Sequence, residues 1–150
     1  SCSKGGCSLL RGIDPLLGPD LLHVLASMGH GDELVIADAN FPASSLGPKC
    51  IRADGATASD VLRAVLSLLP LDNFSDASVL TMQVVGNPDA VPDAVRDFHS
   101  IVESNAGIPL AAVALERFAF YKRAKSAFAV VQTGERRLYG NVILIKGVID

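Results

Sequence analysis

The chain has 150 residues, of which 49% are hydrophobic and 19% charged, and its formal net charge is −3 at pH 7. This length predicts one domain with a sizeable core, and the composition excludes a disordered chain. The 13 Lys and Arg residues are scattered along the sequence, which argues against a nucleic-acid partner. No apolar stretch approaches the roughly 18 residues that a transmembrane helix requires. We therefore expect a cytoplasmic protein that binds neither nucleic acid nor membrane.

The three cysteines also limit the possible classes of protein. They are Cys2, Cys7 and Cys50, an odd number with two members near the start of the chain, which argues against a disulfide framework. A structural zinc site needs four ligands, and Cys2 and Cys7 have no second pair. We expect no metal site, a flexible leader over residues 1–8 and a single domain over residues 9–150.

Helical and strand patterns alternate along the chain. Apolar residues at helical spacing predict helices over 18–29, 57–70 and 93–107. Pro19 suits the first turn of the first helix, Gly29 suits a left-handed C-terminal cap, and either Thr57 or Ser59 can cap the second helix. Short apolar or alternating runs predict strands over 33–38, 49–55, 78–86 and 111–115, the last followed by a short helix.

The C-terminal segment 128–147 predicts two final strands joined by a turn at Gly134. The run over 33–38 is almost continuously apolar, which is typical of a strand buried on both faces in a mostly parallel sheet. Together with the alternation of helices and strands, this pattern predicts an α/β fold. We expect a single layered α/β/α domain with a mixed, largely parallel sheet.

Ionisable side chains flank the predicted strand over 33–38. His30 precedes it between two glycines, and histidine, with an unperturbed pKa of about 6.5, can give and take protons near neutral pH. It can equally be an ordinary loop residue near a helix C-terminus, where the dipole favours it. Asp38 follows the strand, at the edge of an α/β sheet where ligands collect. It can orient a histidine, accept sugar hydroxyls, or simply cap the next turn.

Two pairs of hydrogen-bond donors near the C-terminus have suggestive spacings. Arg117 and Tyr121 are four residues apart, so a helix would place them on one face. Tyr139 and Asn141 are two residues apart, so a strand would direct both to the same side. These side chains suit a neutral, polyhydroxylated ligand. The alternative is that Tyr121 is a core aromatic and that Arg117 pairs with a surface acid.

Five segments in the same order resemble the fucose mutarotase family, which is related to D-ribose pyranase: MGHGDELVIADANFP, IRADG, LLPLD, ERFAFYKRAKSAFAVVQTGE and LYGNVILIKG. The resemblance spans roughly residues 11–148. It implies interconversion of the α and β anomers of a sugar, chiefly L-fucose, without a cofactor. The alternatives are pyranose–furanose interconversion of D-ribose and a monosaccharide-binding module without catalysis. The resemblance also implies a homo-oligomer, decameric rings being among the known forms, with sites between subunits.

The same resemblance places a catalytic histidine at His30. It implies sugar contacts at six further positions, which are Asp38, Asp72, Arg117, Tyr121, Tyr139 and Asn141. Mutarotation requires only proton transfers, so we expect His30 to shuttle a proton, with Asp38 orienting it and Tyr121 as a second acid–base group. The remaining four side chains are expected to hold sugar hydroxyls.

Overall fold

A six-stranded mixed sheet forms the middle layer of the protein, in the order β2-β5-β1-β6-β3-β4. The structure, a computed structural model, describes residues 10–73, 77–106 and 112–149, so the expected leader over residues 1–8 lies outside the described part. The strands are β1 (Glu33–Ala37), β2 (Lys49–Ala53), β3 (Val79–Met82), β4 (Ala112–Leu115), β5 (Ala129–Thr133) and β6 (Val142–Ile145). Strand β6 is antiparallel to both of its neighbours, and the other pairs are parallel. The predicted mixed, largely parallel sheet is confirmed.

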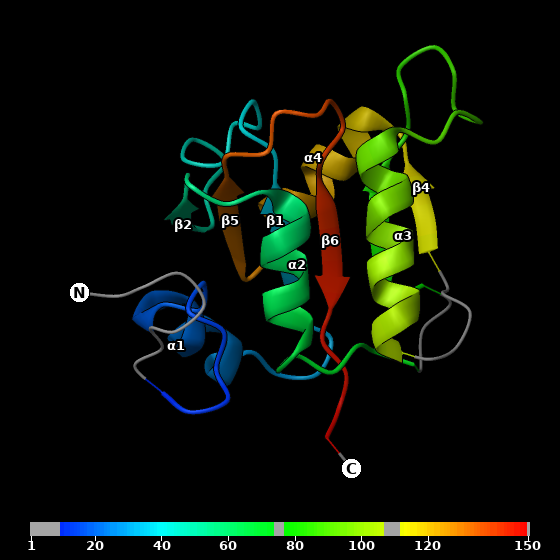
Figure 1. Cartoon of the computed structure of the whole chain (residues 1–150). Coiled ribbons are helices and arrows are strands. Elements are labelled where there is room, and N and C mark those ends of the chain that lie inside the picture. The colour runs from blue at the N-terminus through cyan, green and yellow to red at the C-terminus, as the bar shows by residue number, and fades with distance from the viewer. Residues whose placement is uncertain (1–9, 74–76, 107–111, 150) are drawn as a thin grey trace.

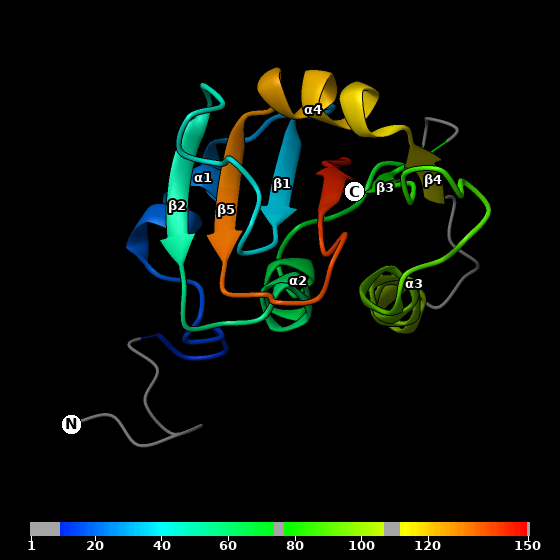
Figure 2. The same cartoon turned by 90° about the horizontal axis from the view of Figure 1, so that it is seen from above.

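Helices cover both faces of this sheet. Figure 2 shows α2 (Ala58–Leu66) and α3 (Asp93–Ala106) on one face and α4 (Arg117–Lys125) on the other. The buried side of α1 (Pro19–Ser27) packs into the same apolar cluster as α2 and α3. The predicted α/β/α layering is therefore confirmed. Within the described ranges, no helix is both long and apolar enough to cross a membrane.

Strand β1 lies at the centre of the core, and its position accounts for its almost entirely apolar sequence. Leu34 and Ile36 point into the cluster under α2 and α3, whereas Val35 and Ala37 point into the cluster under α4. All four side chains have zero exposure. Full burial of an aliphatic side chain contributes roughly 1.5–3 kcal/mol, so this strand must be apolar on both faces.

The end of α1 differs from the expectation. Pro19 does occupy the first turn, but the helix ends at Ser27 and Gly29 is not a left-handed cap. Instead the Gly29 N–H donates to Asp32 Oδ2 at 2.7 Å, and the left-handed residue is Gly31, with φ +87°. A side-chain oxygen thus closes the turn around His30, where the sequence predicts a left-handed glycine. At α2 the alternatives are resolved, since Thr57 Oγ1 accepts the Asp60 N–H.

The two final strands are present as predicted, but no tight turn at Gly134 joins them into a hairpin. Strands β5 and β6 do not pair, because β1 lies between them. The connecting segment 134–141 passes over the carboxyl end of β1, as the orange tube in Figure 1 shows. Gly134 is required by close packing, since a Cβ there would overlap the carbonyl oxygen of Asp54. An apolar strand pattern reports burial but not the partner strand, so the sequence could not exclude a hairpin.

Candidate functional site

A pocket of about 200 Å³ opens at the carboxyl end of β1, where ligands bind in open α/β sheets. Five of the seven predicted site residues line it, namely Asp38, Arg117, Tyr121, Tyr139 and Asn141. They come from three places: the end of β1, the first turns of α4 and the approach to β6. The structure therefore brings together side chains that are up to 103 positions apart, such as Asp38 and Asn141.

Asp38 is buried, with 5% of its surface exposed, and it is surrounded by donors. Its carboxylate accepts the N–H of Asn40 at 3.0 Å, the N–H of Gly140 at 3.2 Å and the amide group of Asn141 at 3.3 Å. Burial raises the pKa of Asp38 above its ordinary value of 3.8, although these hydrogen bonds act in the opposite direction. Asp38 therefore caps the following turn, which was one of the alternatives, and its side chain also lines the pocket.

Asn141 and Asp38 hold each other through reciprocal hydrogen bonds. The backbone N–H of Asp38 donates to Asn141 Oδ1 at 2.7 Å, while Asn141 Nδ2 donates to the Asp38 carboxylate. The side chain of Gln132 also donates to the carbonyl oxygen of Asp38. Because a backbone donor and a carboxylate acceptor need opposite ends of the amide, the orientation of Asn141 is determined.

Tyr139 lines the pocket for a different reason from the one expected. Strand β6 begins at Val142, so strand alternation does not apply, and Tyr139 instead adopts a left-handed conformation with φ +59°. This conformation costs roughly 1–2 kcal/mol for a residue with a Cβ. Its hydroxyl accepts the N–H of Val85 at 3.0 Å, which leaves the phenolic hydrogen for another acceptor.

Arg117 and Tyr121 lie on one face of α4, as their spacing predicts, and both line the pocket. The guanidinium of Arg117 lies 4.7 Å from the ring centroid of Phe118. Among the described residues, its buried Nε has no hydrogen-bond partner. The ring of Tyr121 packs on Phe41 with centroids 5.4 Å apart, so it is both a partly buried aromatic and a pocket residue.

His30 and Asp72 lie at the opposite end of the sheet. The five residues of β1 separate His30 from Asp38, a length of about 17 Å. His30 Nε2 lies 3.2 Å from Asp72 Oδ1, and the two side chains are 47% and 7% exposed. The expectation that Asp38 orients His30 is therefore wrong within one chain. Asp72, expected only as a sugar contact, occupies that position.

The end of β6 brings His30 and Asp72 together. The N–H of Gly31 donates to the carbonyl of Lys146 at 2.9 Å, and the N–H of Asp72 donates to the carbonyl of Ile145 at 2.9 Å. The turn after α1 and the segment after α2 thus dock on consecutive residues of one strand. Sequence reasoning missed this pairing because it depends on a third segment more than 70 positions away from either.

Several apolar residues of the pocket were also missed: Phe41, Met82, Val85 and Leu138. Phe41 and Met82 are 5% and 4% exposed, so nothing in the sequence separates them from the core. Leu138 is 70% exposed, and its position beside Tyr139 was the one available signal. In the part of the chain that the structure describes, no group of three or more His, Cys, Asp or Glu side chains is arranged to hold a metal ion.

Comparison with known proteins finds a family model and solved structures that are similar to this chain. The RbsD/FucU transport protein family model matches residues 11–149. The fucose mutarotase of Streptococcus pneumoniae, solved with L-fucose, has 43% identity and a TM-score of 0.88, covering 94% of this chain and 100% of that one. FucU of Bifidobacterium longum has 41% identity and a TM-score of 0.86, covering 93% and 100%.

A more distant likeness connects the chain to the ribose branch. RbsD of Bacillus subtilis, solved with D-ribose, has 25% identity and a TM-score of 0.70, covering 89% of this chain and 95% of that one. The resemblance noted from the sequence is confirmed, since the family model spans nearly the whole chain and the fold agrees over the same length. This protein belongs to the RbsD/FucU family.

Proposed function

We propose that this protein is a cofactor-independent sugar mutarotase that interconverts the α and β anomers of L-fucose. The observation that carries the proposal is the pocket formed by Asp38, Arg117, Tyr121, Tyr139 and Asn141. The 43% identity to a fucose mutarotase solved with L-fucose supports the choice of sugar. The wider family supports a monosaccharide ligand in general.

The pocket suits a small, neutral, hydroxyl-rich molecule. Its volume of about 200 Å³ is below the 300–1,000 Å³ usual for drug-sized ligands. The carboxylate of Asp38 can accept hydrogen bonds from sugar hydroxyls, while the Arg117 guanidinium and the Tyr139 hydroxyl can donate to sugar oxygens. Asn141, which holds Asp38 in place, completes a ring of polar groups around a partly apolar wall.

The proposed reaction needs only proton transfers. A base removes the proton from the anomeric hydroxyl while an acid protonates the ring oxygen, and the bond between C1 and the ring oxygen breaks. The open-chain aldehyde rotates about C1–C2, and the same hydroxyl attacks the other face of the carbonyl as both protons return. Positioned acid–base groups contribute about 10²–10⁴-fold, or roughly 3–5 kcal/mol of barrier, which suffices for a reaction that already occurs in water.

We assign the proton shuttle to His30, with Asp72 as the carboxylate that orients it. A carboxylate beside the imidazole fixes its tautomer and stabilises its protonated form. Tyr121 is the second acid–base group, and Asp38 is an acceptor of sugar hydroxyls. Because His30 and Asp38 lie at opposite ends of β1, the two groups of one chain cannot act on the same sugar. The pocket of one chain is therefore completed by His30 and Asp72 of a second copy.

Exposed apolar side chains beside each half support such head-to-tail association. Leu138 and Val85 line the pocket and are 70% and 57% exposed. At the other end, Ile149 and Leu68 are 82% and 39% exposed and border a groove that also contains Met28, two residues before His30. A head-to-tail contact that repeats around an axis closes into a ring, so we propose a cyclic homo-oligomer.

Saturation-transfer NMR with L-fucose and D-ribose tests the proposed function. We expect the purified protein to accelerate exchange between the α and β signals of L-fucose above the buffer rate. Preferential exchange between pyranose and furanose forms of D-ribose would assign it to the ribose branch instead. Sugar binding without accelerated exchange would make it a binding module, and neither binding nor exchange would reject a sugar site.

A further inference from the structure

The segment 134–141 carries Tyr139 and Asn141 to the pocket, and it also carries an ion pair that faces away from the pocket. Glu135 is 4% exposed, and Arg137 is its partner. Arg137 Nη2 donates to Glu135 Oε1 at 2.9 Å and Arg137 Nε donates to Oε2 at 3.1 Å, so the pair is bidentate. The backbone N–H of Arg137 adds a third bond to Oε2 at 3.2 Å.

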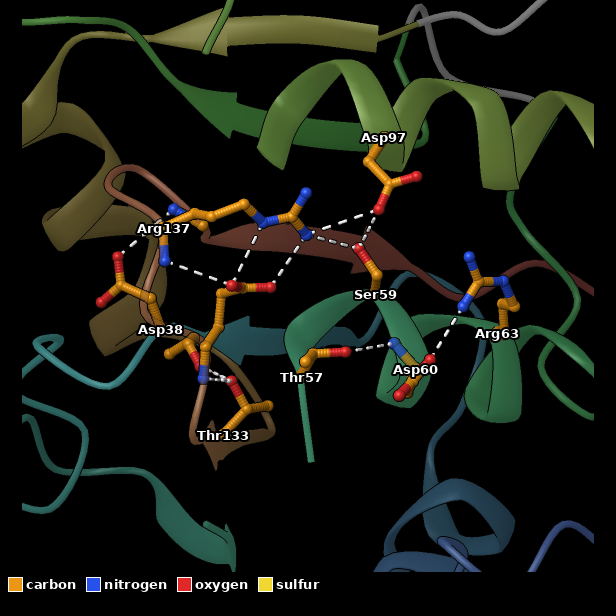
Figure 3. Close-up of polar contacts among 11 residues, drawn as sticks. Asp38, Thr57, Ser59, Asp60, Arg63, Asp97, Thr133 and Arg137 are labelled. Carbon is orange, nitrogen blue, oxygen red and sulfur yellow. Dashed lines mark hydrogen bonds and ion pairs between the residues drawn. The ribbon is translucent and has the colours of Figure 1, made fainter. Parts of the chain in front are cut away.

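This ion pair is anchored to two helices. Arg137 Nη2 donates to Ser59 Oγ at 2.9 Å and lies 3.4 Å from Asp97 Oδ2. Ser59 in turn donates to Asp97 at 2.5 Å. Figure 3 shows the Arg137 side chain reaching from its loop toward Ser59 on α2 and Asp97 on α3. The Glu135 carboxylate also accepts a backbone hydrogen bond from Ala58 at the start of α2.

The same ion pair is in direct contact with the backbone of the pocket. A Cβ on Gly140 would lie 2.8 Å from Glu135 Cγ, so the Glu135 side chain packs against Gly140. The N–H of Gly140 donates to Asp38, and the N–H of Ala39 donates to the Glu135 carbonyl at 2.8 Å. Glu135 therefore lies between α2 and the residue that connects Tyr139 to Asn141.

Tyr139 is the residue in this segment that most needs contacts to hold its backbone in place. Its left-handed backbone persists only if the surroundings hold it there, because a relaxed loop would recover the cost of that conformation. Only the carboxylate of this ion pair is buried, since the Arg137 side chain is 39% exposed, and solvent screening limits the net stability that the pair contributes. What a bidentate pair does provide is a defined geometry, which a lysine or a neutral side chain cannot reproduce.

We propose that Glu135 and Arg137, braced by Ser59 and Asp97, are positioning residues that hold Tyr139 in its sugar-binding conformation. The inference rests on the proposed function for its kinetic consequence, but not for its structural one. Tyr139 binds a sugar hydroxyl in both the ground state and the transition state. We call Glu135, Arg137, Ser59 and Asp97 the brace. Loss of the brace should therefore raise KM more than it lowers kcat. A merely structural role would lower the amount of folded enzyme, and thus the apparent kcat, at unchanged KM.

The chain contains two tyrosines, Tyr121 and Tyr139, so 3-fluorotyrosine labelling gives two ¹⁹F resonances. The Tyr121→Phe variant assigns them by removing one. The test compares Arg137→Met, Arg137→Lys and Ser59→Ala, with Arg136→Met as a matched control. Arg136 is exposed and adjacent, so its substitution removes the same charge from the same loop without touching the brace.

We expect Arg137→Met to shift or broaden the Tyr139 resonance while the Tyr121 resonance moves less, and Arg136→Met to leave both in place. For L-fucose exchange we expect KM to rise about tenfold in Arg137→Met with kcat changed much less, and by a smaller factor in Arg137→Lys. If Arg137→Met does not fold, Ser59→Ala decides, because it removes one anchor of Arg137 with a minimal change in volume.

An unchanged Tyr139 resonance and an unchanged KM in every variant that folds would overturn the positioning role. So would a loss of apparent kcat alone that parallels the loss of folded protein. If the unsubstituted protein exchanges no sugar, the proposed function fails, whereas the fluorine resonance, which needs no sugar, still decides whether the brace holds Tyr139.

Discussion

His30 Nε2 lies 3.2 Å from a carboxylate oxygen of Asp72, although the two residues are 42 positions apart. The carboxylate is buried and the imidazole is about half exposed, so the histidine faces solvent while its partner is held within the fold. A carboxylate in this position fixes the tautomer of an imidazole and stabilises its charged form. Neither His30 nor Asp72 can reach the pocket around Asp38 in the same chain.

Asp72→Asn tests this pair. Asparagine has the same shape but no charge to stabilise the imidazolium, so we expect the L-fucose exchange rate to fall about tenfold or more. The measurement is saturation-transfer NMR at saturating sugar, with cooperative unfolding to verify the fold. Asp89→Asn, a substitution of an exposed loop carboxylate, is the control. A rate equal to that of the control would remove Asp72 from the mechanism.

A second prediction concerns the two halves of the site. One variant carries His30→Ala, and a second variant carries both Arg117→Ala and Tyr121→Phe. Each variant should lose exchange activity while staying folded. Co-refolding the two variants in equal amounts should restore about a quarter of the sites, because a head-to-tail contact can then join two intact halves. Exchange NMR and sedimentation on the mixture provide the measurement. No recovery in a mixed oligomer of the normal size would argue against a shared site.

Tyr121→Phe separates acid–base catalysis from binding. The ring of Tyr121 packs on Phe41, and phenylalanine keeps that contact while removing the hydroxyl. As a proton donor or acceptor, Tyr121 should affect kcat by about tenfold or more and KM much less. Exchange rates over a range of L-fucose concentrations give both constants. A rise in KM alone would reduce Tyr121 to a sugar contact.

The brace around Arg137 predicts a pH dependence of stability. The hydrogen bond from Arg137 holds the pKa of Glu135 below its ordinary value of 4.5, and that from Ser59 holds the pKa of Asp97 below 3.8. Both folded-state values are depressed, so the unfolded chain binds more protons. Their stabilisation is complete above those ordinary values and is lost as the pH falls through the folded pKa values. We call this fall in the free energy of unfolding at low pH the acid limb. Arg137→Met should make the acid limb less steep.

Urea midpoints measured from about pH 3 to pH 6 for the unsubstituted protein and for Arg137→Met and Arg136→Met provide the comparison. Asp38 contributes in the opposite sense, because burial raises its pKa and its contribution is lost as the pH rises through that value. Asp38 is present in all three proteins, so a difference between the two arginine variants reports on the ion pair and on the residues that it contacts. Equal acid limbs for the two arginine variants would contradict the assignment.

Gly147→Ala tests the packing that places Asp72. A Cβ at this position would overlap the carbonyl oxygen of Leu71 and lie 2.9 Å from the backbone nitrogen of Asp72. We expect a loss of roughly 1–3 kcal/mol in the free energy of unfolding, as for other overpacked sites. Gly55→Ala is the matched control, because a Cβ there meets nothing within 4 Å. Urea unfolding measures both, and equal stabilities would show that the segment around Leu71 can shift freely.

Local patterns predicted much of what the structure contains. The sequence patterns indicated a helix or strand at the place of each element in the described residues, although the strand expected over 78–86 ends at Met82. The four-residue spacing of Arg117 and Tyr121 correctly placed both on one face of α4. The position of Asp38 directly after a buried strand correctly indicated the end of the sheet at which the pocket opens. Each of these inferences depends on residues within one turn or one strand, where side-chain direction follows from backbone geometry alone.

The pairing of strands was decided only by the tertiary structure. The insertion of β1 between β5 and β6 carries the segment 134–141 across the sheet, and this crossing, not strand alternation, brings Tyr139 and Asn141 to Asp38. It also creates the contact between Glu135 and Gly140. A buried apolar strand can pair with any other, so the order of the sheet is a property of the whole core.

For His30, the local sequence determined the turn in which it lies, and the tertiary structure determined its partner. The sequence alone determined that His30 lies in a tight glycine-flanked turn before β1, because helix and strand signals lie on both sides of it. Its partner was decided by tertiary structure, since the turn of His30 and the segment of Asp72 dock on consecutive carbonyls at the end of β6. Backbone hydrogen bonds between distant segments have no local sequence pattern. For this reason the sequence could not predict that Asp72, and not Asp38, lies beside His30.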